Sequence, residues 1–188
     1  MHAALLSGSL ALALPASAHA SFTVIKGIDN WNAQVGPCTT LDFVFPNAQY
    51  LSTQYASLGA NFEGDEYAFD GPLSVFQQDG WGCGADDGGV DITFLSPQYA
   101  IGAWFPGSLR VDFYWQGQLM YQSPNLDTFP LSYAFGGVIS TQAFDRVRFW
   151  DPGDGHPFID DILFVPGPGA LGLVMVAVAT RGWRRRAW

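Results

Sequence analysis

Histidine is scarce in this chain, which contains only His2, His19 and His156. The first two lie in an apolar leader, so the remainder of the chain keeps His156 alone. One histidine is too few for a His-based zinc site or for two histidines acting as acid and base. No Gly-x-Ser-x-Gly motif offers a serine nucleophile to His156. We therefore interpret His156 as a polar loop residue and expect no enzyme activity.

Basic residues are also few. Residues 21–164 contain four of the eight basic residues and all 17 acidic ones, which gives this segment a net charge of −13. A surface of this charge repels phosphate backbones, so nucleic acid is not expected as a partner.

Turn-forming and aromatic residues are abundant, with 22 Gly, 12 Pro and 15% aromatics. This composition favours an all-β fold with large rings packed between strands. Gln116-Gly117 predicts a tight hairpin, and one short helix is expected at 52–58. Short apolar runs recur at the spacing of a sandwich. They predict strands near 22–25, 41–45, 61–63, 74–76, 90–94, 100–105, 109–115, 118–123, 133–139, 146–150 and 158–164.

The first twenty residues have the pattern of a signal peptide. An apolar run from Leu5 to Leu14 is ended by Pro15, and Ala18 and Ala20 supply the small residues that signal peptidase recognises. We expect cleavage after Ala20 and export of the chain. The alternative is a buried N-terminal helix.

Residues 165–188 have a different composition from the rest of the chain. A Pro-x-Pro joint precedes an apolar run at 170–179, and basic residues follow it. The sixteen residues 165–180 fall short of the ~20 that span a bilayer comfortably. The arginines should keep the C-terminus in the cytoplasm. We expect a short C-terminal transmembrane helix that anchors only marginally.

This tail resembles the PEP-CTERM sorting signal. Val165, Pro166 and Pro168 match its Val-Pro-Glu-Pro motif, with Gly167 in place of the glutamate, and the arginine cluster is Arg184, Arg185 and Arg186. The resemblance implies processing by an exosortase at the inner membrane, followed by location at the cell surface or outside the cell. The alternative is an ordinary tail anchor that stays in the membrane.

The middle of the chain, residues 21–164, is similar to the core domain of PEP-CTERM proteins. The segments that carry this similarity are 54–62, 136–140, 144–149 and 159–164. The resemblance implies a jelly-roll-like β-sandwich, similar to carbohydrate-binding modules.

Cys38 and Cys83 are the only cysteines. Export would place them in an oxidising compartment, so we predict a disulfide that closes a loop of about 45 residues. The alternative is two free thiols.

A structural calcium ion is a further hypothesis, with no other cofactor expected. Asp160 shares a strand face with Ile162 and Phe164, and an inward carboxylate needs a partner. Asp42, on an early strand, could join it if the terminal strands lie together, and oxygen ligands suit calcium.

Two tryptophans are candidates for sugar binding. Trp81 lies among glycines that leave it room to be exposed, and Trp31 is the second candidate, whereas Trp104 is interpreted as a core residue. The alternative for Trp81 is that its ring covers the disulfide.

Taken together, these features predict an exported, non-enzymatic surface or matrix protein associated with exopolysaccharide or biofilm. A carbohydrate-binding module is the second hypothesis. A small glycoside hydrolase is the third, because 17 acids leave a catalytic pair arithmetically available.

Overall fold

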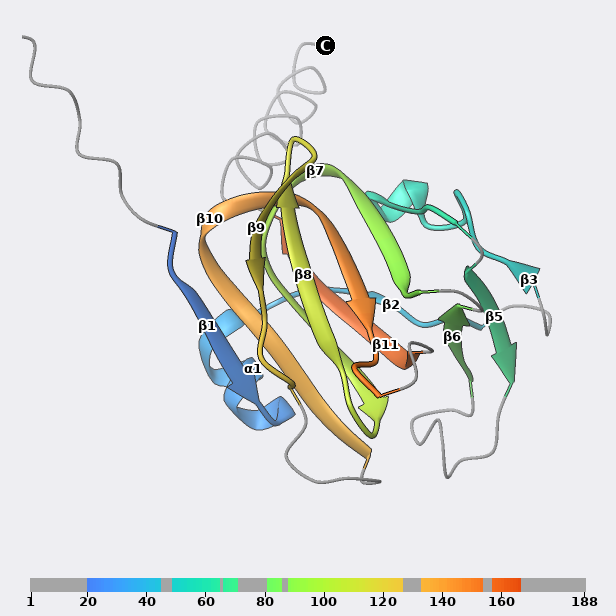
Figure 1. Cartoon of the computed structure of the whole chain (residues 1–188), viewed down its shortest axis with the longest axis horizontal. Coiled ribbons are helices and arrows are strands. Elements are labelled where there is room, and N and C mark those ends of the chain that lie inside the picture. Colours follow the sequence, from blue (N-terminus) through green and yellow to red (C-terminus); the bar gives the residue numbers. More distant parts are fainter. Residues whose placement is uncertain are drawn as a thin grey trace, which may run out of the picture.

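The computed structural model describes residues 20–44, 49–64, 66–70, 81–85, 88–126, 133–153 and 157–166 (Figure 1). Within these ranges the fold is all-β, as predicted, with one α-helix, α1 (Ile28–Val35), and a 3₁₀ turn, η1 (Ala56–Leu58). The described strands are β1 (Phe22–Lys26), β2 (Thr39–Leu41), β3 (Gln49–Tyr50), β4 (Ala60–Phe62), β5 (Glu66–Asp70), β6 (Trp81–Ala85), β7 (Val90–Pro106), β8 (Arg110–Trp115), β9 (Gln118–Gln122), β10 (Tyr133–Trp150) and β11 (Phe158–Pro166).

Two long strands, β7 and β10, organise the fold. They pair with each other in antiparallel register, and the register is interrupted between Ile139 and Arg146. Bulges of this kind bend strands. The second half of β7 pairs with β11, and the first half of β10 pairs with β1. We call these four segments the first layer. In the second layer, the first half of β7 pairs with β4, and the second half of β10 pairs with β8. Strand β8 pairs in turn with β9.

Aromatic rings fill the space between the two layers. Phe94 in the second layer contacts Phe164 of β11, with ring centroids 5.0 Å apart, and Phe113 lies 5.0 Å from Phe144. At the β1 edge, Phe22 stacks on Tyr121 of β9 at 4.3 Å. The layers therefore face each other across a core of large rings, whose burial is the main source of stability.

Helix α1 covers the outer face of the first layer, beside β1 and β10 in Figure 1. Its Trp31 is fully buried and meets Phe135 of β10 edge-on, with centroids 5.5 Å apart. The sequence interpretation missed this helix, although Ile28, Trp31 and Val35 have the i, i+3, i+7 spacing of one apolar face.

Several local expectations can be compared with the structure. Strands expected at 90–94 and 100–105 are one strand, β7, and those at 133–139 and 146–150 are both parts of β10. The helix expected at 52–58 is only η1, and Gly59 ends it at φ 90°. The hairpin is confirmed, with Gln116 at φ 50° and Gly117 at φ 78°. The strand expected at 74–76 lies outside the described residues.

The ends of the chain lie mostly outside the described residues. The predicted signal peptide up to residue 19 and the tail from residue 167 are therefore not described. Strand β11 continues to Pro166, whose backbone pairs with Gln98. Within the described part of the chain, no helix is long and apolar enough to cross a membrane.

Candidate functional site

The predicted disulfide is wrong: Cys38 and Cys83 are both free thiols. Cys38 lies directly before β2, and Cys83 lies in β6. Both strands pair with β11, but at opposite ends of it. Cys83 faces Ile159, whereas Thr39, next to Cys38, faces Phe164. At ~3.3 Å per residue, this offset separates the two cysteines by roughly 20 Å. A disulfide requires Cα atoms less than ~7 Å apart, so the two strands cannot be linked in this way.

The proposed calcium ligands lie in different surroundings. Asp160 is fully buried, but the register of β11 shifts between Asp160 and Ile162, where Asp160 pairs with Trp104 and Ile162 with Ala103, so the expected strand face shared with Ile162 and Phe164 is interrupted. Asp42 is exposed, although its neighbouring strand β2 does pair with β11, as expected. The Tyr55 hydroxyl donates to Asp42 Oδ1 over 3.3 Å. In the described ranges, no three His, Cys, Asp or Glu side chains form a group that could hold a metal. Calcium therefore stays a hypothesis.

The two tryptophans named for sugar binding fare differently. Trp31 has no exposed surface, so no face of its indole is open to a ligand, and that prediction is wrong. The reason is α1, which turns the ring inward onto Phe135. The backbone of Trp81 belongs to β6, but its side chain lies outside the described part of the structure.

A cleft of about 490 Å³ lies beside α1, and we call it the α1 cleft. Its walls are the turn from Lys26 to Asn30, the rings of Trp104 and Phe135, and the side chains of Leu126 and Ala134. Trp104 is half-buried there rather than a core residue. The sequence signal that could have placed it is alternation along β7, where Ala103 and Phe105 are fully buried and Trp104 faces the other way.

Backbone hydrogen bonds fix the turn that forms one wall of the α1 cleft. Gly27, at φ 81°, donates its N–H to Phe135 O over 2.9 Å, which ties the turn to β10. Asn30 Nδ2 donates to Lys26 O over 2.9 Å, so the amide side chain is held in one orientation. The cleft thus combines aromatic surface with a carboxylate, an amide and an ammonium group, a combination suited to binding a polar ligand.

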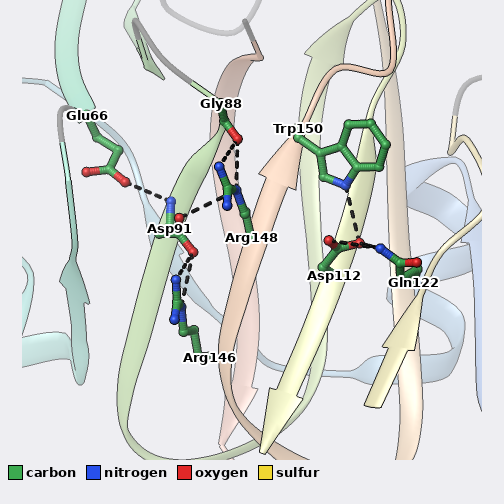
Figure 2. Close-up of polar contacts among 8 residues, drawn as sticks. All are labelled: Glu66, Gly88, Asp91, Asp112, Gln122, Arg146, Arg148 and Trp150. Atoms are coloured by element: carbon green, nitrogen blue, oxygen red, sulfur yellow. Dashed lines mark hydrogen bonds and ion pairs between the residues drawn. The ribbon is translucent and has the colours of Figure 1, made fainter. Parts of the chain in front are cut away.

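A second polar surface lies on the outer face of the second layer, and we call it the arginine face (Figure 2). Asp91 Oδ1 accepts hydrogen bonds from Arg146 Nε and Nη2 at 3.1 and 2.7 Å. Arg148 Nε lies 3.6 Å from Asp91 Oδ2, and Arg148 donates to Gly88 O as well. Glu66 Oε1 accepts the backbone N–H of Asp91 over 2.8 Å. One nearly buried carboxylate therefore holds two arginines.

The same face continues toward β9. Asp112 Oδ1 accepts the Trp150 indole N–H and an amide N–H of Gln122, both over 3.2 Å. The Arg110 guanidinium lies 5.3 Å from the centre of the Trp150 ring. Because these groups bond to one another across neighbouring strands, the arginine face is a network that joins β7, β10, β8 and β9.

Asp91 raises the pKa of one arginine of this face. Burial alone would lower the pKa of the Arg146 guanidinium, but the hydrogen bonds and the charge of Asp91 outweigh it, and the pKa is raised. Arg146 also lies over the Tyr114 ring, 5.1 Å from its centroid. The guanidinium is thus engaged on two sides, and we regard the arginine face as structural.

The interior also contains a buried thiol, Cys83 of β6. Burial raises the pKa of Cys83 well above its usual value, and the charges of Glu66 and Asp160 add to the rise. A thiol held protonated in this way is a poor nucleophile and a poor metal ligand.

The α1 cleft is consequently the arrangement best suited to a ligand among the described residues. In comparisons with known proteins, no family model, no curated protein and no solved structure matches this chain.

Proposed function

We propose that this chain is an exported, C-terminally sorted protein of the cell surface or extracellular matrix, where it is associated with exopolysaccharide and acts without catalysing a reaction. One observation carries the proposal: an apolar leader with Ala18 and Ala20 and a Pro-x-Pro tail with an arginine cluster lie on the two sides of one β domain.

The domain is suited to this position in the chain. Its last strand, β11, is paired along its length and runs up to Pro166, the first proline of the joint. An enzyme that cuts beyond Pro168 would thus remove residues that contribute no strand to the described sheet. A jelly-roll-like sandwich, similar to carbohydrate-binding modules, is our finer proposal for the two packed layers.

The tail is proposed to work as a temporary anchor. Residues 165–180 are too few to span a bilayer comfortably, and the arginines that follow fix its orientation. Pro166 and Pro168 prevent helical hydrogen bonding just before the apolar run. An extended backbone next to the membrane is accessible to an exosortase-type processing enzyme.

Intact-mass measurement of the surface-bound or secreted protein tests this proposal. We expect a form that begins at Ser21 and lacks the residues beyond the Pro-x-Pro joint. The matched variant replaces Arg184, Arg185 and Arg186 by Gln and should accumulate the unprocessed tail without a change in melting temperature. A surface form that retains Trp188 would show that the tail is a permanent anchor, and one that retains Met1 would overturn the export signal.

Carbohydrate binding is the second candidate function. The α1 cleft favours it, because a half-buried indole and hydrogen-bonding side chains line one cavity. Its ligand is the subject of the next subsection.

A further inference from the structure

We propose that the α1 cleft binds one residue of an uncharged polysaccharide, with the sugar ring packed against Trp104 and its hydroxyl groups hydrogen-bonded to Asp29 and Asn30. The inference names the ligand class of the extracellular role proposed above and rests on it.

The aromatic wall of the α1 cleft is held rigidly. Trp104 lies at the centre of the first layer, where its backbone faces Phe135 on one side and Asp160 on the other. Its ring meets Phe135 edge-on at 5.3 Å, and Phe135 meets the buried Trp31 edge-on at 5.5 Å. This row of three rings fixes the indole before a ligand arrives, so little conformational entropy is lost on binding. The flat, C–H-rich side of a pyranose ring packs well on such a surface.

The turn before and at the start of α1 supplies hydrogen-bond acceptors and donors to the cleft. Asp29 is exposed, and no hydrogen bond or ion pair among the described residues involves its carboxylate. Asn30 donates one amide N–H to Lys26 O, and this hydrogen bond orients the remaining N–H and the side-chain oxygen of Asn30. Neighbouring hydroxyl groups on a sugar ring match such a pair of side chains, because each hydroxyl both donates and accepts.

Charge selects an uncharged ligand. The α1 cleft contains one cation, Lys26, and one anion, Asp29. The segment 21–164 as a whole carries −13, so a polyanion such as a polyuronate would be repelled on approach. The other three basic residues of that segment lie on the arginine face, where Asp91 and Trp150 engage them.

The cleft is better equipped for binding than for hydrolysis. Cleavage of a glycosidic bond commonly uses two carboxyl groups on either side of it. The described wall of the α1 cleft contains one, Asp29. We therefore expect a bound sugar chain to remain intact.

Isothermal titration of the purified full-length chain tests the inference, in a detergent without a sugar headgroup. The probes are hexasaccharides of glucose, mannose and N-acetylglucosamine, and a hexauronate is the charged comparison. We expect at least one neutral probe to bind with a dissociation constant of about 1 mM or lower, and the hexauronate to bind at least about tenfold more weakly. Trp104→Ala and Asp29→Ala should each weaken the neutral probe by about tenfold or more.

The controls separate loss of the ligand wall from loss of the fold. Trp150→Phe changes a tryptophan on the arginine face and should leave sugar binding unchanged, and melting temperatures show whether each variant is folded. If Trp104→Ala does not fold, the test rests on Asp29→Ala, because Asp29 is exposed and its replacement should not disturb folding. Absence of binding by all neutral probes, equal binding of the hexauronate, or full binding by folded Asp29→Ala would each overturn the inference. None of these results bears on tail processing, which the intact mass tests separately.

Discussion

The indole of Trp31 lies directly on the backbone of Gly137. A Cβ atom added at Gly137 would come within 2.6 Å of Trp31 Cζ3 and 3.0 Å of Ile101 O. Since Trp31 is the residue that seats α1 on the first layer, this glycine makes room for the whole helix. The contact also supports the α1 cleft, because Phe135 lies between Trp31 and Trp104.

Replacing Gly137 by Ala should therefore destabilise the fold by about 1–3 kcal/mol, because the added methyl group has no space. Urea unfolding of Gly137→Ala, Trp31→Leu and the double variant measures this. The double variant should cost less than the sum of the two, since the smaller side chain relieves the clash. Strict additivity would show that the two residues are not in contact.

Replacing Asp91 by Asn should lower stability by about 1–2 kcal/mol, as measured by urea unfolding. The change removes the charge that Arg146 and Arg148 share, and both arginines are about a third exposed, so solvent screening limits the loss. Asp145→Asn is the matched control, because that partly buried carboxylate accepts only the Gln116 N–H among the described contacts. A loss no larger than that of the control would contradict the role of Asp91 as the centre of the arginine face.

Cys38 and Cys83 should differ in reactivity toward iodoacetamide. Burial, together with the charges of Glu66 and Asp160, raises the pKa of the Cys83 thiol, so it should react only after unfolding. Cys38 is half-exposed and should react in the native protein. Peptide mapping by mass spectrometry identifies the labelled residue. A Cys38–Cys83 disulfide in exported material would instead contradict the pairing of β2 and β6 with β11.

Stability should fall as the pH rises above about 9. Burial is the main reason that the pKa of Tyr55 is raised from its usual 10.0, and the pKa of Cys83 is raised from 9.0. Above these ordinary values the unfolded chain loses protons that the folded chain retains, so the unfolded state is favoured. Each group contributes at most about 1.4 kcal/mol per pH unit.

Unfolding free energies measured from pH 8 to 11 check this expectation. Cys83→Ala should reduce the slope, because it removes the buried thiol whose pKa is raised. A slope that is equal in wild type and Cys83→Ala would show that the thiol does not titrate in this way.

Sequence patterns predicted those features that depend on neighbouring residues. The hairpin at Gln116-Gly117 forms because glycine tolerates positive φ, and the all-β class follows from aromatic strands separated by turns. Each of these is decided within a few residues of the chain, so no distant contact is needed to infer it.

The tertiary structure alone decided what depends on distant segments. The sequence suggested a disulfide because two cysteines were present, but their positions along β11 are set by how β2 and β6 pair with it. The sequence suggested that Trp31 binds a ligand and that Trp104 is a core residue. In the structure Trp31 is fully buried and Trp104 is only half-buried. Helix α1 can bury Trp31 only where Gly137 leaves space, and the turn at Gly27, tied to Phe135, leaves Trp104 beside an open cleft. Burial of a side chain depends on what packs against it, and that partner came from more than a hundred residues away.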